Sequence, residues 1–356
     1  MIRKFNLFFI FLFLFTKIFS QTGGTSTYSF LELTNSARVA AMGGNLNSVN
    51  DNDLNLTYHN PALLTAEMDQ TLVLNYVNYF AGINYGYVSY ARNIKNFGVF
   101  AGGIQYINYG KFIEADDKGI VTGEFNASEF ALSLTYSHPI NELFTVGATI
   151  KPVISTLENY TSLGISADFG ALYNSPEKLF SAALVVKNLG TQLKSYTSET
   201  DNLPLNVQIG ISQKLKHAPL RFSIIADHLE KPDLSYTIEN NDSDLDLLTG
   251  EETSESAIDK IADGVMRHII IGLEFMPVEN LYLRAGYNYR RRQEMIIETR
   301  TAMSGFSWGF GLKISKFHIN YGRATYHLAG ASDHISISTN LESFYKRHES
   351  ISSSEY

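Results

Sequence analysis

The 356-residue chain contains no cysteine, which excludes disulfides, thiolate metal sites, cysteine nucleophiles and lipid attachment through a cysteine. Beyond residue 20 it also lacks any apolar run of about 18 residues, so no membrane-spanning helix is expected there. The formal net charge is −8, and an acidic chain is a poor binder of nucleic acid. Tryptophan occurs once, whereas the 23 Phe, 21 Tyr and 26 Gly indicate a protein rich in strands.

The first twenty residues, MIRKFNLFFIFLFLFTKIFS, have the pattern of a secretory signal peptide. Arg3 and Lys4 form a positively charged start, a Phe- and Leu-rich stretch follows, and Ser20 is small enough for cleavage after it. The apolar stretch is too short for a spanning helix. We therefore expect residues 1–20 to be a signal peptide and the rest of the chain to be exported.

From residue 70 onward apolar and polar residues alternate with a period of two, which indicates strands. The clearest case is FSWGFGLKIS, in which Phe306, Trp308 and Phe310 share one face while serine, glycine and lysine occupy the other. Fourteen candidate strands follow, near residues 70–79, 82–92, 96–109, 123–137, 142–152, 161–173, 179–187, 204–216, 219–227, 266–276, 281–291, 304–315, 317–326 and 333–341.

A soluble sandwich and a membrane barrel both produce such alternation, and three features favour the barrel. The polar faces are small or charged, aromatic residues gather near the segment ends, and the segments have the length of a tilted strand that crosses a bilayer. Short connections also alternate with longer ones, as in barrels with turns on one side and loops on the other. We predict an all-β, transmembrane outer-membrane antiparallel β-barrel of about 14 strands over 67–342, followed by a polar tail at 343–356.

Residues 21–66 do not alternate and are too few for a domain. TNSARVAAMGG predicts a short helix that is capped by Asn35 or Ser36 and ends at two glycines, and YHNPALL predicts a second helix start. A barrel of fourteen strands encloses more space than its own side chains fill, so we expect this segment to be a plug or hatch in the barrel. The candidate plug residues are Asn35, Arg38, Gly43, Gly44, Asn60 and Pro61.

Two charged clusters are candidate contacts for a partner or for lipopolysaccharide. The acidic loop 229–265 contains Asp242, Asp244 and Asp246 at the spacing of a calcium loop, but Leu247 replaces the required glycine. Two interpretations therefore stay open: loose calcium binding, or an ordinary solvated acidic loop tip. A basic cluster, expected at the outer end of one hairpin, could instead pair with lipopolysaccharide phosphates, pair with the acidic loop, or form an ordinary charged rim. Its members are Arg290, Arg291 and Arg292, with Arg284 and Arg300.

No motif supports an enzyme. Ser175 and Lys178 have the Ser-x-x-Lys spacing, but they lie in an expected tight turn, and the companion Ser-Asp-Asn and Lys-Thr-Gly elements are missing. A Gly-x-Ser-x-Gly elbow is missing as well. We therefore expect no catalytic residues, no metal and no cofactor.

The opening GGTSTYSFLELTNSARVAAMGG, followed by NPALL and then by strands, resembles the PorV/PorQ family, and most closely its PorQ members. These are outer-membrane barrels of the type IX secretion system of Bacteroidetes, and they are similar to FadL-type barrels with fourteen strands and a hatch. The resemblance implies a non-enzymatic scaffold of the cell-surface attachment complex, with a PorZ-type surface protein, PorU and PorV as partners. The alternative is a FadL-like transporter of hydrophobic compounds.

Overall fold

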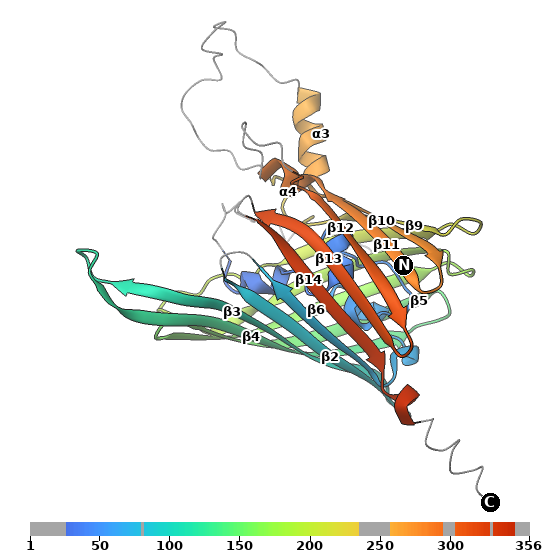
Figure 1. Ribbon diagram of the computed structural model, residues 1–356, viewed down its shortest axis with the longest axis horizontal. Helices are drawn as coiled ribbons and strands as arrows, with labels where there is room; N and C mark the ends of the chain where they lie inside the picture. The colour runs from blue at the N-terminus through green and yellow to red at the C-terminus, as the bar shows by residue number, and fades with distance from the viewer. Residues whose placement is uncertain (1–25, 80–81, 235–256, 295–302, 328–329, 346–356) are drawn as a thin grey trace, which may run out of the picture.

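Fourteen antiparallel strands close into a single barrel, as Figure 1 shows. The computed structural model describes residues 26–79, 82–234, 257–294, 303–327 and 330–345. Each strand pairs with its neighbours in the sequence, and β1 closes the ring by pairing with β14 from Thr71↔Asn340 to Asn78↔Asp333. The predicted fold class and strand number are confirmed.

Short turns join the strands at one end of the barrel, the turn end. The bounds of the strands are β1 (Thr71–Asn78), β2 (Asn84–Ile94), β3 (Gly98–Ala115), β4 (Val121–Pro139), β5 (Phe144–Leu157), β6 (Tyr160–Asn174), β7 (Phe180–Lys194), β8 (Asn206–Lys214), β9 (Leu220–Ala226), β10 (Ile269–Val278), β11 (Leu281–Asn288), β12 (Phe306–Ile314), β13 (Phe317–His327) and β14 (Gly330–Asn340). The long connections, β7–β8, β9–β10 and β11–β12, all lie at the other end, the loop end.

The main differences from the predicted strands lie at the loop end. β3 and β4 continue as a hairpin beyond Asn108, the last residue of β3 that pairs with β2, and this hairpin projects from the barrel in Figure 1. β5 and β6 also run on to a tight turn where a longer loop was expected. β11 ends at Asn288, and the arginine-rich residues that follow form the short helix α4 (Tyr289–Glu294). The sequence pattern cannot predict where a strand leaves the barrel wall, because strands inside and outside the wall alternate with the same period of two.

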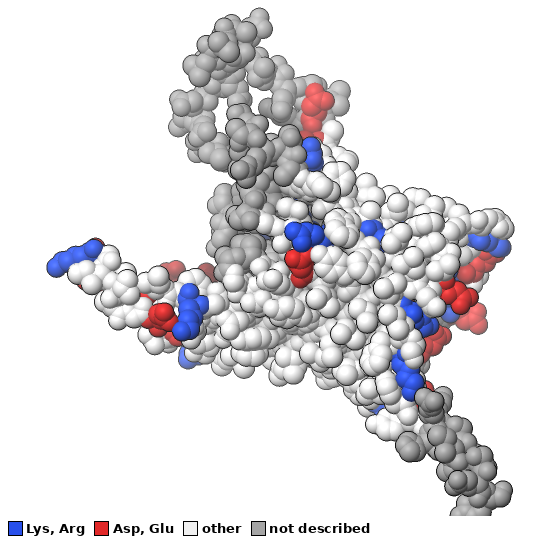
Figure 2. All heavy atoms as spheres, viewed as in Figure 1, with Lys and Arg blue, Asp and Glu red and all other residues white. Residues whose placement is uncertain are grey.

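The barrel wall turns its apolar face outward. On β4, Leu132 and Leu134 are exposed while Thr135 and Ser137 are buried, and the same alternation continues around the barrel. In Figure 2 the visible wall carries few charged residues, which gather toward the strand ends and at the tip of the β3–β4 hairpin. An exterior of this kind suits lipid, because a soluble sandwich buries its apolar face.

Residues 26–68, the described part of the chain before β1, lie inside the barrel and include short helical pieces, drawn in blue in Figure 1. α2 packs against β11 to β14, and η3 packs against β4 to β6, so the two pieces contact different parts of the wall. We call residues 26–68 the plug. Its elements are η1 (Ser29–Glu32), α2 (Ala37–Ala41), η2 (Leu54–Tyr58), η3 (Pro61–Leu63) and η4 (Ala66–Met68).

Two side-chain caps set the helix starts in the plug. Ser36, and not Asn35, caps α2, because its Oγ accepts from the Val39 backbone N–H at 3.3 Å. Asn60 caps η3 through its Oδ1, which accepts from the Ala62 N–H at 2.9 Å, and Pro61 takes the first helical position. Of the helices that the structure describes, none is long and apolar enough to cross a membrane.

Candidate functional site: the buried polar regions of the lumen

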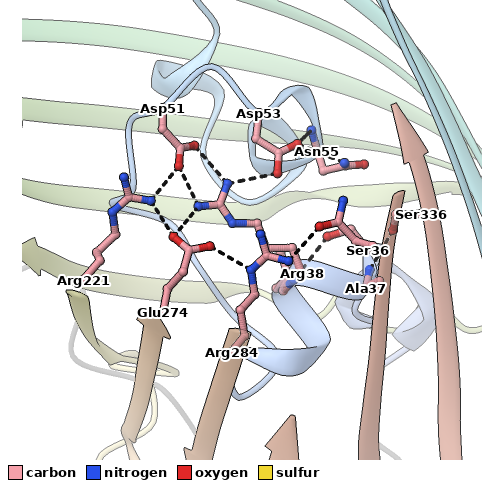
Figure 3. Close-up of polar contacts among 12 residues, drawn as sticks. Ser36, Ala37, Arg38, Asp51, Asp53, Asn55, Arg221, Glu274, Arg284 and Ser336 are labelled. Carbon is pink, nitrogen blue, oxygen red and sulfur yellow. Dashed lines mark hydrogen bonds and ion pairs between the residues drawn. The ribbon is translucent and has the colours of Figure 1, made fainter. Parts of the chain in front are cut away.

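A closed set of ion pairs joins the plug to the wall near the turn end (Figure 3). Helix α2 carries Arg38 into the lumen, where its guanidinium donates to Asp51 Oδ2 at 2.6 Å and to Asp53 Oδ2 at 3.1 Å. The same guanidinium reaches Glu274 Oε2 on β10 at 3.0 Å. Arg38 therefore links two parts of the plug to the barrel wall.

Glu274 is the centre of this set, and it is fully buried. Strand register places it between two arginines, since Glu274 lies opposite Arg221 on β9 and opposite Arg284 on β11. Its carboxylate accepts from Arg221 Nη1 at 2.8 Å and from Arg284 Nε at 2.7 Å, in addition to Arg38. Arg221 also donates to Asp51 at 2.6 Å.

These six residues form the lumen ion network: Arg38, Asp51, Asp53, Arg221, Glu274 and Arg284. Three guanidinium groups face three carboxylates, so the formal charge of the network is balanced. Buried charges are tolerated when they are paired and hydrogen-bonded, and removing one partner leaves the others uncompensated. The network therefore ties the plug to strands β9, β10 and β11.

Glycines let the other side of the plug lie directly on the wall. A Cβ atom on Gly147 of β5 would lie 2.4 Å from the carbonyl carbon of Pro61. A Cβ atom on Gly170 of β6 would lie 2.0 Å from Asn60 Oδ1. Only glycine permits this approach, and the capped turn at Asn60 and Pro61 occupies the space that side chains would fill.

A second polar region, the loop-end cavity, lies between the plug and the loop end of the barrel and has a volume of about 60 Å³. Four strands, the plug and α4 contribute to its lining, which is almost entirely polar or charged. The lining residues are Glu32, Gly44, Asn45, His59, Lys187, Asn188, Asn206, Gln208, Asp227, His228, Ile270, Asn288, Arg290 and Arg291.

Lys187 on β7 is the unusual member of this lining. Its side chain is only 4% exposed, yet among the described residues its ammonium has no hydrogen-bond acceptor and no carboxylate partner. It lies over the Tyr58 ring, with Nζ 4.7 Å from the ring centroid. By contrast, the nearby Lys151 pairs with Asp168 at 2.7 Å and donates to Asn188 Oδ1 at 2.6 Å.

His228, just beyond β9, is enclosed by carboxylates. Its Nδ1 lies 3.1 Å from Glu230 Oε1, and its Nε2 lies 3.6 Å from Glu32 Oε1 and 3.8 Å from Asp227 Oδ2. Burial disfavours the imidazolium, but the Asp227 carboxylate and the Glu230 hydrogen bond outweigh burial and raise the pKa of His228 above its ordinary value. His228 therefore lies between Glu32 of the plug and the carboxylates of Asp227 and Glu230 at the loop end.

A third space, the turn-end cavity, has a volume of about 460 Å³ and lies where residues 64–66 of the plug meet the turn ends of β2 to β5. Plug residues and the β2–β3 and β4–β5 turns surround it. Its lining includes exposed or partly exposed apolar groups such as Phe97, Tyr136 and Pro139, with Asn93, Ser137 and His138 among the polar ones. Among the described residues, no three His, Asp or Glu side chains are arranged so that they could hold a metal ion.

The six candidate plug residues all lie inside the barrel. Asn35 Oδ1 lies 3.0 Å from His59 Nε2, and Gly43 and Gly44 end α2 with positive φ angles of 96° and 97°. Arg38 belongs to the lumen ion network, and Asn60 and Pro61 contact the glycines of β5 and β6.

The predicted basic cluster is divided. Arg290 and Arg291 line the loop-end cavity, and Arg292 lies beside Gly305 on the next segment. The expectation for Arg284 was wrong, because this residue points into the lumen and pairs with Glu274 far from the hairpin's outer end. Arg300 and the candidate contacts Asp242, Asp244 and Asp246 lie outside the described residues.

Sequence reasoning missed Glu274, Arg221 and Lys187. A signal was present, since each stands on the otherwise small polar face of a strand that points inward. A charged residue on that face must find a partner or a wet space in the lumen. The sequence alone gives no indication of which of the two applies.

No family model and no curated protein matches the chain. Among solved structures it is similar to the P. putida toluene transporter TodX, with 13% identity, 87% of this chain and 99% of that chain covered, and a TM-score of 0.49. A Pseudomonas aeruginosa FadL homologue gives 11% identity, coverage of 86% and 98%, and a TM-score of 0.47. The KdgM porin is more distant, with 5% identity, coverage of 76% and 99%, and a TM-score of 0.34. At these identities the likeness concerns the barrel fold.

Proposed function

We propose that the protein is an integral outer-membrane barrel that acts as a scaffold and not as an open pore. The supporting observation is the plug, which lies in the lumen and is tied to β9, β10 and β11 by the lumen ion network. An open channel needs a continuous water-filled or apolar path, and a packed plug with buried ion pairs obstructs one. Its working surfaces then lie outside the lumen.

The β3–β4 hairpin is the strongest candidate for such a surface. Beyond Asn108 its two strands pair only with each other among the described residues. Their outer edges carry no further strand, although the Asn126 carbonyl at the base of β4 still accepts from the Glu158 N–H at 3.2 Å. Two apolar residues on this part of the hairpin, Ile113 and Val121, are 70% and 64% exposed. Exposed apolar side chains and free strand edges are features of sites that receive another protein.

The resemblance of residues 23–64 to the PorV/PorQ family supplies the class of partner. On that basis the scaffold would belong to the type IX secretion system and hold a PorZ-type surface protein near PorU and PorV, with lipopolysaccharide around its loop end. The barrel itself would carry out no chemical step.

The test is co-purification of the intact barrel from its native membrane, followed by mass spectrometry of bound proteins. We expect a large surface protein with the wild type, and a reduced yield of it with an Ile113→Ser, Val121→Ser hairpin variant. A matched control replaces lipid-facing Leu132 and Leu134 of the same strand β4 with Val and should retain the partner. A barrel that purifies without any protein partner would contradict the scaffold.

Closure of the lumen has a separate test. Gly147→Val places a side chain where Pro61 lies, so it should displace the plug and raise single-channel conductance in planar bilayers. Gly102→Val is the matched control, because no atom lies within 4 Å of the position that its Cβ would take. If the wild type already conducts as much as the Gly147→Val variant, the plug does not close the lumen.

The second candidate function is transport of hydrophobic compounds, and the turn-end cavity favours it. This cavity has the size of a small-ligand site, and apolar groups border it beside the plug. Transport of such a compound is also stated in the name of TodX. Organic extraction of the purified barrel should then release one apolar molecule per chain, and Val99→Trp, which fills the cavity, should prevent its retention. Purification with a protein partner and without any such molecule would support the scaffold instead.

A further inference from the structure

The loop-end cavity has the features of a built binding site. Its lining comes from strands β7, β8, β10 and β11, which hydrogen bonds hold in register, and from plug residues packed between them. Gly44 leaves the space that the Arg291 guanidinium occupies, because a Cβ atom there would lie 2.1 Å from Arg291 Nη2. The arginine is thereby brought to the edge of the cavity.

Lys187 indicates which kind of ligand the cavity would bind. A buried ammonium group needs acceptors, and the Tyr58 ring supplies one apolar face but no oxygen. No described carboxylate lies within ion-pair distance of Lys187 Nζ, although the neighbouring Lys151 has one. An oxygen-rich anion in the cavity would supply the missing acceptor.

The charges around the cavity have the matching sign. Lys187, Arg290 and Arg291 face two carboxylates, Glu32 and Asp227. Both carboxylates already lie near His228, at 3.6 Å and 3.8 Å, and Arg290 has its own neighbour in Glu294 at 3.7 Å. Lys187 is thus the cation best placed to meet an anion. Arg291 lies in the same lining, and ammonium and guanidinium groups both bind oxyanions strongly.

The volume fits a small ion. By the measure in which one water needs about 10–15 Å³, this cavity holds roughly four to six water molecules. A phosphate ion has five heavy atoms and fits the same space. A lipid headgroup cannot enter from the side, since β7 and β8 pair without interruption from Phe180↔Gln213 to Lys187↔Asn206.

We propose that the loop-end cavity is a binding site for a free oxyanion of phosphate size, with Lys187 Nζ as its central donor and Arg291 at its mouth. The site is independent of the scaffold role, because it lies in the lumen and not on the β3–β4 hairpin. Any anion of this shape that reaches the loop end is a candidate ligand, and inorganic phosphate is the simplest probe.

Equilibrium dialysis of the purified full-length barrel against radiolabelled inorganic phosphate tests the site. We expect one phosphate per chain, and a loss of affinity of about tenfold or more in Lys187→Met, since one charge-assisted hydrogen bond is removed. Lys187→Arg should restore most of the affinity. Lys111→Met, on the exposed β3–β4 hairpin, is the control and should bind as the wild type does.

Heat-modifiable migration on SDS gels checks that each variant is folded, and Arg291→Gln serves as a second variant if Lys187→Met does not fold. A parallel experiment with vesicles that contain lipopolysaccharide tests the lipid source. The proposal is overturned if the wild type takes up no phosphate, if Lys187→Met and wild type bind equally, or if only the lipid-bound phosphate competes.

Discussion

The lumen contains two buried charged regions that handle their charge in opposite ways. In the lumen ion network every arginine contacts Glu274. In the loop-end cavity Lys187 is as deeply buried but has no carboxylate partner among the described residues. The first arrangement fastens the plug to the wall, whereas the second leaves a positive group beside a space of about 60 Å³. Buried charges therefore attach the plug to the wall at the turn end, whereas at the loop end we infer that a buried charge binds an anion.

Strand register explains the difference. Glu274 lies directly between Arg221 and Arg284 on neighbouring strands, so three long side chains meet without bending the wall. Lys187 lies opposite Asn206, which carries no charge. A polar neighbour can accept a hydrogen bond but does not neutralise an ammonium group, so Lys187 keeps its charge available to the cavity.

The largest expected effect comes from removing the centre of the network. Glu274→Gln leaves three arginines around a neutral amide, and breaking a buried ion pair costs about 3–5 kcal/mol. We expect this loss in the free energy of unfolding, measured by urea titration of the barrel in lipid vesicles. Glu124→Gln is the control, because Glu124 and its partner Lys111 are both exposed and such pairs contribute little. Equal effects of the two substitutions would remove the distinction between a network and ordinary surface pairs.

Lys187→Met should change stability in the opposite direction. A buried ammonium without a partner costs free energy, and methionine fills a similar volume without that cost, so we expect an increase of about 1–3 kcal/mol in phosphate-free buffer. The same urea titration measures it. Saturating phosphate should stabilise the wild type and not the variant. A destabilised Lys187→Met barrel would mean that the lysine is structural and that the two regions do not differ.

A smaller effect is expected at the helix that carries Arg38. Ser36→Ala removes the cap of α2 and should cost about 1 kcal/mol, less than the loss of the network itself. Asn35→Ala is the comparison, since Asn35 is not the cap and contacts His59 instead. Hydrogen exchange of the α2 backbone amides reports the difference: protection should fall in Ser36→Ala and stay near wild type in Asn35→Ala.

The fold could be predicted from the sequence to a much greater extent than the sites. Alternation such as that of FSWGFGLKIS depends only on neighbours along one strand, so all fourteen strands were found, and apolar residues faced outward as expected. The network joins Arg38 to Glu274, which lies 236 residues further along the chain. A pattern of neighbouring residues cannot predict a contact over that separation. Arg284 was predicted to lie at the outer end of the hairpin with Arg290 to Arg292, but it points into the lumen and pairs with Glu274. The helix start at Asn60 and Pro61 could be predicted, because a cap involves only residues close in sequence. Its packing against Gly147 and Gly170 could not.

The smallest expected effect is a pH dependence confined to the loop end. Burial and the Arg290 charge lower the pKa of His228 in the folded protein, but Asp227, the hydrogen bond with Glu230 and the Glu32 charge outweigh them and raise it. Its contribution to stability is therefore complete below the ordinary histidine value of about 6.5 and is lost as pH rises through the higher folded value. Wild type should lose thermal stability between pH 6 and pH 9 relative to His228→Gln, and its η1 amides should exchange faster, whereas α2, which the arginine network fastens, should not respond. A response of both regions together would show that the plug moves as one body and that its two attachments are not independent.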